Sequence, residues 1–145
     1  MRKLGFAEAF ARYGAKLRNL YWSVCAEAVD GSLVVSLWEH HFEPPKDGKV
    51  VCRDSFARWE GAGNAEFREL VRKAFKTGQI VRVVMAHAED RAAVQAGHDL
   101  TKVRKTYGVK DWKGRVLSIE GDNYAIEFER NGSRSADASG LTAAT

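Results

Sequence analysis

The sequence predicts an α+β fold, with a strongly curved antiparallel sheet or a small β-barrel and two or three short helices. Short runs of alternating apolar and polar residues recur along the chain, and tight turns such as Asp30-Gly31 and Gly121-Asp122 separate them. These runs do not alternate with helices in the regular order of βαβ units, which argues against a parallel sheet. The length of 145 residues predicts a single domain, over residues 1–130.

The longest β-type stretch covers residues 21–60 and predicts a three-stranded antiparallel meander. Side chains alternate from Leu33 to Phe42, as expected when successive residues leave opposite faces of a sheet. Asp30-Gly31 predicts the first hairpin turn, because glycine adopts a positive φ without steric cost. The segment Pro44-Pro45-Lys46-Asp47-Gly48 predicts a longer connection to a third strand over residues 49–60.

Apolar spacing of three and four residues predicts two longer helices. The first covers residues 4–20, and Gly14 marks a point where it can end. The second covers residues 65–77, with Asn64 as its N-cap and Gly78 as the left-handed residue that closes it. A short third helix is predicted over residues 91–95.

The second half of the chain predicts more strands and a tail. Residues 79–87 form the most apolar run and are rich in β-branched side chains, which predicts a central strand covered on both faces. Alternation predicts a strand over residues 101–110 and a hairpin of residues 115–120 and 123–130. Residues 131–145 are rich in Ser, Ala and Gly, which predicts a disordered tail.

Composition and charge limit which partners and which cellular compartment we expect. The net charge of +4 and the pI near 9.2 permit a polyanionic partner without requiring one. No apolar run is long enough to cross a membrane and no apolar leader opens the chain, so we expect a cytoplasmic protein without a membrane partner. Cys25 and Cys52 are then expected to be buried, reduced thiols, although their places on neighbouring predicted strands also permit a disulfide.

Aromatic residues give the first candidate site. Trp22, Trp38 and Trp59 fall on the three strands of the predicted meander. Rings that share one face would form a wall on which a nucleic-acid base can stack. The alternative is that each ring belongs to the core or its rim. The polar side chains that could bond the edge of a stacked base are Ser23, Ser36, His40 and Asp54.

A cluster of cations gives the second candidate site, a phosphate-binding segment that also contains Tyr107 and Trp112. The alternative is a solvated basic surface. The cations are Lys102, Arg104, Lys105, Lys110, Lys113 and Arg115.

Acidic and histidine side chains raise a third possibility, a metal-dependent hydrolase that uses Glu39, His41 and Asp54. Their spacing matches no standard zinc motif, because there is neither a helical HExxH pair nor a pair of closely spaced cysteines. No Ser, Cys or Lys stands in the sequence context of a nucleophile. We therefore expect no metal, no cofactor and no catalytic residue.

The order of these features resembles a known superfamily. A short helix leads into Tyr21-Trp22, and Trp-bearing strands, a helix and a last hairpin with GRV and GDNYAIEF follow. This order resembles the topology of the PUA-like barrels, the superfamily of the EVE, ASCH and SRA modules, over residues 21–130. The resemblance implies a module that recognises RNA or modified DNA bases, often beside a nuclease.

The sequence thus favours a non-catalytic nucleic-acid-binding module that reads an extruded or modified base of DNA or RNA. A small protein-binding effector of phage or mobile-element type, which blocks a host enzyme, is the first alternative. The metal-dependent hydrolase is the second.

Overall fold

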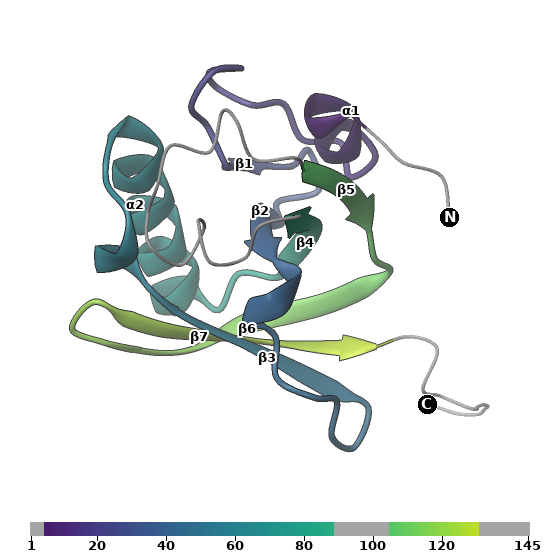
Figure 1. Cartoon of the computed structure of the whole chain (residues 1–145), viewed down its shortest axis with the longest axis vertical. Coiled ribbons are helices and arrows are strands. Elements are labelled where there is room, and N and C mark those ends of the chain that lie inside the picture. Colours follow the sequence, from purple (N-terminus) through teal and green to yellow (C-terminus); the bar gives the residue numbers. More distant parts are fainter. Residues whose placement is uncertain (1–4, 89–104, 131–145) are drawn as a thin grey trace.

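The computed structural model describes residues 5–88 and 105–130. Within these residues, two helices, α1 (Phe6–Ala11) and α2 (Ala62–Thr77), and two short 3-10 turns, η1 (Glu39–His41) and η2 (Phe56–Arg58), accompany one mixed sheet (Figure 1). The seven strands are β1 (Cys25–Glu27), β2 (Leu33–Trp38), β3 (Lys49–Ser55), β4 (Val81–Ala88), β5 (Lys105–Val109), β6 (Trp112–Glu120) and β7 (Asn123–Arg130). The predicted α+β class is confirmed.

The sheet is curved and open. Its order is β1-β2-β4-β6-β7-β3, with β5 paired to β4. Two residues separate β5 from β6, and the chain changes partner there: β5 pairs with β4, while β6 keeps one pair with β4, Val81 to Gly114, and otherwise pairs with β7 (Figure 1). Among the described strands, β1 and β3 end the order without pairing with each other, so the sheet does not close into a barrel.

One pair of strands contradicts the expectation of a purely antiparallel sheet. Strands β2 and β4 are parallel, in register from Leu33 with Val81 to Trp38 with Ala86. The reason is the crossover between them, since β3, η2 and α2 carry the chain back to the start of β4. The sequence has the elements of such a crossover, but β3 belongs to a different part of the sheet, which hides the pattern.

The prediction of a three-stranded meander is half right. Strands β1 and β2 form the predicted hairpin, and Gly31 has the expected positive φ of 89°. Strand β3 is not the third strand of this meander, because it pairs along its length with β7. Strand β2 stops at Trp38, and η1 together with the Pro44-Pro45 segment carries the chain to the other half of the sheet. The alternation from Leu33 to Phe42 therefore ends four residues early.

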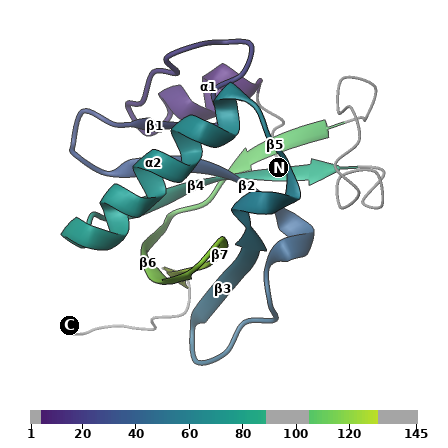
Figure 2. The same ribbon diagram turned by 90° about the vertical axis from the view of Figure 1, so that its left-hand side faces the viewer.

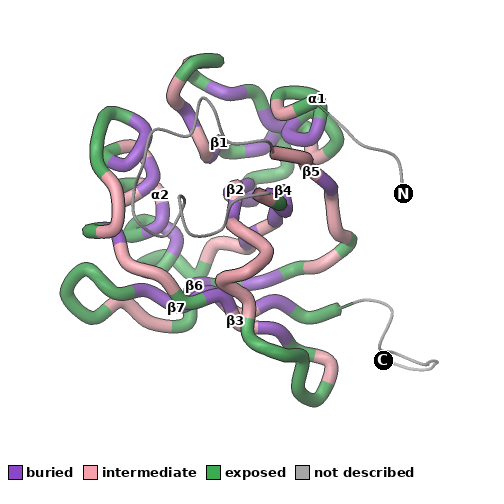
Figure 3. The backbone as a smooth tube through the Cα atoms, in the orientation of Figure 1, coloured by how far each residue is buried: buried purple, intermediate pink, exposed green. Residues whose placement is uncertain are grey.

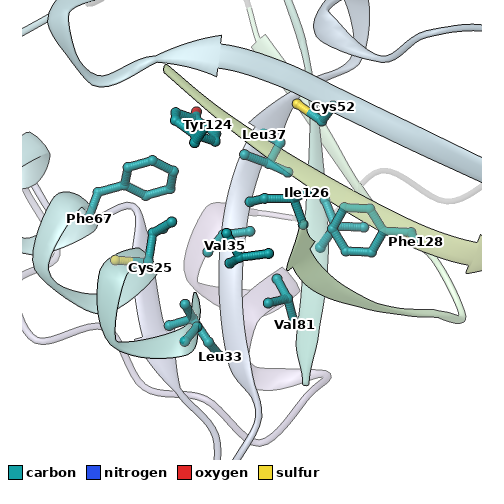
Figure 4. Close-up of a cluster of buried hydrophobic side chains, with 14 of the residues drawn as sticks. Cys25, Leu33, Val35, Leu37, Cys52, Phe67, Val81, Tyr124, Ile126 and Phe128 are labelled. Carbon is teal, nitrogen blue, oxygen red and sulfur yellow. The ribbon is translucent and has the colours of Figure 1, made fainter. Parts of the chain in front are cut away.

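Two apolar layers cover the central strands, as predicted for the apolar run at residues 79–87. Leu33, Val35 and Val83 belong to the main core beneath α2, whereas Val34 and Val84 belong to a second cluster beneath α1. Figure 3 shows this burial along the central strands, and Figure 2 shows α2 lying across the sheet. In Figure 4 the main core joins side chains of α2, β2, β4 and β7. Burial on both faces explains why these strands are continuous apolar runs.

Both helices depart from their predicted bounds. Helix α2 begins at Ala62 with Gly61 as its N-cap, so Asn64 lies in the first turn and is not the cap. Gly78 closes α2 in the left-handed conformation, as predicted. Helix α1 ends at Ala11, well before residue 20, and Gly14 follows with a φ of 77°. Gly14 thus falls just beyond the end of a helix that the apolar spacing extended too far.

Three predictions lie outside the described residues: the helix at 91–95, the first part of the strand at 101–110, and the tail at 131–145. The strand that the structure does describe there is β5. The last hairpin is confirmed, since β6 and β7 pair with Glu120 opposite Asn123. No helix within residues 5–88 and 105–130 is long and apolar enough to span a membrane.

Candidate nucleic-acid interface

Aromatic side chains from four parts of the chain line one open pocket of about 330 Å³. Trp22 and Tyr21 come from the turn before β1, Trp38 from the end of β2, Tyr107 from β5 and Phe6 from α1. Lys105, at the start of β5, is the cationic side chain among the lining residues. The remaining lining residues are Leu20, Ser23, Val24, Ser36 and Ala86. Among the described residues, the pocket therefore combines several aromatic side chains with one lysine and two serine hydroxyls.

Pairing of β2, β4 and β5 and the packing of α1 against β5 form the inner wall of this pocket. Trp38 pairs with Ala86 of β4, and Ala86 pairs in turn with Tyr107 of β5. The rings of Phe6 and Tyr107 lie 4.9 Å apart, so α1 closes the pocket against β5. Burial raises the pKa of the Tyr107 hydroxyl, which keeps it neutral at physiological pH. This wall is an uncharged aromatic surface.

Helix α2 fixes the turn that carries Trp22. A Cβ atom on Gly63 would overlap the carbonyl oxygen of Trp22, so glycine is needed for this close approach. The next residue, Asn64, is buried, and its Nδ2 donates hydrogen bonds to the carbonyl oxygens of Phe56, at 2.7 Å, and of Trp59. The first turn of α2 thus holds the backbone at both Trp22 and Trp59.

A smaller inner cavity of about 90 Å³ adjoins the aromatic pocket. The two share Val24, Ser36 and Trp38 as lining residues. Leu37, Trp59 and Phe67 complete the apolar side of the cavity. The polar residues of its lining, besides Ser36, are His41, Asp54, Arg58 and Tyr124.

Asp54 is the centre of the polar side. Arg58 Nε lies 3.0 Å from both carboxylate oxygens, and Arg58 Nη2 lies 2.9 Å from Oδ2. His41 Nδ1 lies 3.3 Å from the same Oδ2, and the Tyr124 hydroxyl donates to it at 3.4 Å. Burial by itself would raise the pKa of Asp54, but the hydrogen bonds and charges of His41 and Arg58 outweigh it and lower the pKa to about 2. Asp54 is therefore an ionised carboxylate bonded within the protein.

The structure brings part of the predicted stacking set together. Trp22 and Trp38 line the aromatic pocket, whereas Trp59 lines the inner cavity with Trp38. The fourth tryptophan, Trp112, packs against Phe42 and Phe128 at the edge of the main core. Trp38 is thus the ring that both hollows share.

The polar residues predicted to bond a base edge are placed differently from one another. Ser36 lines both hollows, and Ser23 lines the aromatic pocket. His40 lies on η1, with its ring 6.2 Å from that of Trp38 and 4.4 Å from that of His41. Asp54 lines the inner cavity, but its oxygens already accept hydrogen bonds from Arg58 and Tyr124.

The predicted phosphate-binding cations are dispersed over the fold. Lys105 lines the aromatic pocket, and Lys110 Nζ lies 5.8 Å from the centroid of the Trp112 ring. Lys113 and Arg115 lie on β6 opposite Glu129 and Glu127 of β7, in a separate hollow with Lys49. Carboxylates opposite these two cations weaken their attraction for phosphate. Lys102 and Arg104 lie outside the described residues.

The sequence reading missed Phe6, Tyr107 and Arg58 as site residues. Phe6 lies in the helix predicted over residues 4–20 and Tyr107 in the predicted basic segment, and no local pattern shows that α1 and β5 meet. Asp54 and Arg58 are oppositely charged and four residues apart, but Asp54 lies on β3 and only Arg58 lies on η2, so the turn that follows the strand brings them together.

The set proposed for a metal-dependent hydrolase does not gather at one point. His41 contacts Asp54, whereas Glu39 Oε1 lies 3.9 Å from His87 Nδ1. Within the described part of the chain, no group of three His, Cys, Asp or Glu side chains is placed to hold a metal ion.

Comparison of the chain with protein-family models, curated proteins and solved structures finds no match.

Proposed function

We propose that this protein is a non-catalytic nucleic-acid-binding module that holds a base in the aromatic pocket. One observation carries the proposal: Trp22, Trp38, Tyr107 and Phe6 line a single open pocket together with Lys105. Aromatic faces attract the face of any base, at about 1–3 kcal/mol per stacked base. A lysine beside them supplies the charge that a phosphate needs.

The sign of the charge at the pocket favours a nucleotide over a cationic ligand. Aromatic cages also bind methylated ammonium groups, because the faces of the rings are electronegative. The charged side chain of this lining is Lys105, which repels a cation and attracts an anion. The net charge of +4 acts in the same direction over longer distances. An aromatic anion is therefore the ligand that fits best.

The resemblance to PUA-like barrels supports the same proposal on separate grounds. It implies a module that binds RNA or modified DNA bases, and the mixed, curved sheet with α2 on one side is compatible with a relative whose barrel is open. A cytoplasmic location, beside nucleic acid, belongs to this proposal.

A binding assay tests the proposal. Fluorescence anisotropy with labelled single strands of about 12 nucleotides, DNA and RNA, should show binding that weakens steeply as salt is raised. Trp38→Ala should lower the affinity roughly 5- to 150-fold, the equivalent of about 1–3 kcal/mol for one lost stack. The circular dichroism of the variant should match that of the parent protein, so that lost binding is not lost folding.

A matched pair of lysine variants locates the phosphate contact. Lys105→Ala should weaken binding and reduce its salt dependence, because it removes a cation from the pocket. Lys113→Ala should have little effect, because Lys113 lies in another hollow opposite Glu129. Absence of binding to every DNA and RNA probe at low salt, or equal binding by the Trp38 variant, would refute the proposal.

A protein-binding effector is the second candidate, and the exposure of apolar side chains favours it. Leu20 is 70% exposed and Tyr21 is 97% exposed, side by side at the mouth of the pocket. Adjacent exposed apolar residues commonly mark a contact surface. A stoichiometric protein partner that co-purifies after nuclease treatment, and is lost in Leu20→Ser, would support this candidate over the first.

A further inference from the structure

The turn before β1 presents a tyrosine to solvent at the mouth of the aromatic pocket. Tyr21 is 97% exposed, and it is one of the residues that line the pocket, beside Trp22. A ring this exposed adds little to the stability of the fold, because its apolar surface remains in water. Four other aromatic residues line the same pocket and are partly buried, so Tyr21 is the most exposed aromatic residue of this lining.

This turn is held by hydrogen bonds. The Asn19 side chain accepts from the backbone amide of Tyr21 at 2.8 Å, and the amide of Asn19 donates to Ser23 Oγ at 3.0 Å. The amide of Ser23 donates to the carbonyl oxygen of Asn19 at 3.0 Å. Close packing of Gly63 against Trp22 fixes the far side. The exposure of Tyr21 is therefore a built feature of a constrained turn.

We propose that Tyr21 is a second stacking platform, which holds the base next to the one in the pocket, and that the ligand is consequently a single strand contacted at two successive bases. This inference rests on the proposed function, because it assigns the strand type and the number of bases to the same site. Tyrosine suits this role, since it offers a large face and loses little conformational entropy on binding.

The geometry favours a single strand over a duplex. In a duplex the base faces are covered by neighbouring bases, so the pocket and Tyr21 can reach them only after unpairing and unstacking, which costs a few kcal/mol for each base. A single strand presents the faces of successive bases without this cost, which is why exposed aromatic side chains are typical of single-strand binding. Two platforms for adjacent bases thus select the single strand.

Comparison of ligands of different length tests the inference. The probes are nucleoside monophosphates, single strands of about 12 nucleotides and blunt duplexes of the same sequence, with mixed-base DNA and RNA versions. Wild-type protein should bind the single strands more tightly than the monophosphates and more tightly than the duplexes. Tyr21→Ala should lower affinity for single strands roughly 5- to 150-fold more than for monophosphates, the effect of one lost stack. Tyr21→Phe, which keeps the ring, should restore the wild-type ratio.

Each result separates this inference from the proposed function. If Trp38→Ala loses binding of both ligand lengths but Tyr21→Ala leaves the ratio between them unchanged, the pocket binds a base and the second platform is refuted. Equal or tighter binding of the duplexes refutes the single-strand assignment. If no nucleic-acid probe binds and a protein partner is lost in the Tyr21 variant, both proposals fail together. Tyr21 is so exposed that its replacement leaves folding intact, which a thermal unfolding curve verifies.

Discussion

Arg58 Nε lies 3.0 Å from both carboxylate oxygens of Asp54, and the two side chains are 10% and 7% exposed. This buried pair connects β3 to η2, immediately before Trp59. His41, on η1, contacts the same Asp54 carboxylate, and η1 follows directly after Trp38 at the end of β2. One carboxylate therefore ties together the two turns that flank the tryptophans of the inner cavity.

Removal of Arg58 should be strongly destabilising. In Arg58→Ala the Asp54 carboxylate stays buried without its main partner, and breaking a buried ion pair in this way costs about 3–5 kcal/mol. Urea unfolding of the variant and of the wild type measures the difference in the free energy of unfolding. Arg53→Ala is the matched control, because Arg53 makes a similar Nε contact of 2.8 Å with Glu43 but is 56% exposed. Such an exposed pair contributes about 0–1 kcal/mol. Equal losses in the two variants would contradict the structural role given to Asp54.

The same carboxylate makes stability depend on pH in the acid range. Its pKa is lowered from 3.8 to about 2 in the folded protein, so the unfolded chain takes up the proton first as pH falls. The stabilisation is complete above the unfolded pKa and is lost as pH falls from about 4 toward about 2; its size is roughly 2 kcal/mol. Urea unfolding at several pH values should show this loss in the wild type and a smaller one in Asp54→Asn. A variant with the same pH slope as the wild type would show that other carboxylates are responsible.

Gly63, in the first turn of α2, should tolerate no side chain. Alanine normally stabilises a helix interior by up to about 1 kcal/mol relative to glycine. In Gly63→Ala the added methyl group would overlap the Trp22 carbonyl oxygen, so we expect lower stability and a shift of tryptophan fluorescence as the turn moves. Gly5→Ala is the control for the clash, because among the described residues a Cβ atom there would meet only the Glu8 Cβ, at 4.0 Å. A stabilised Gly63 variant with unchanged fluorescence would contradict the packing described above.

Both cysteines should be unreactive thiols in the folded protein. Cys25 and Cys52 are buried and unpaired with each other, and in Figure 4 Cys25 lies beside α2 whereas Cys52 lies on β3. Burial raises the pKa of both thiols, so the reactive thiolate is scarce. A thiol reagent should react slowly with the native protein and rapidly with two thiols per chain after denaturation. Rapid reaction before unfolding, or no free thiol after it, would contradict this.

Much of the local structure was legible in the sequence. The Asp30-Gly31 hairpin, the apolar run of β4, the left-handed Gly78 and the final hairpin all follow from alternation and from the backbone preferences of a few residues. The stop of β2 at Trp38 was not legible, since Glu39, His40 and His41 continue an alternating pattern while forming a 3-10 turn. Asn64 is a good capping residue, but it is the third residue of α2, and Gly61 takes the N-cap position.

The sequence by itself determined which segments extend, which coil and where several turns fall, because those properties depend on residues near one another in the chain. The tertiary structure alone decided that β2 lies parallel to β4, that β3 pairs with β7, and that Phe6, Trp22, Trp38 and Tyr107 meet around one pocket. Partners so distant in sequence are selected by the packing of the whole core, and a short segment of sequence does not show which distant segments will pack against it.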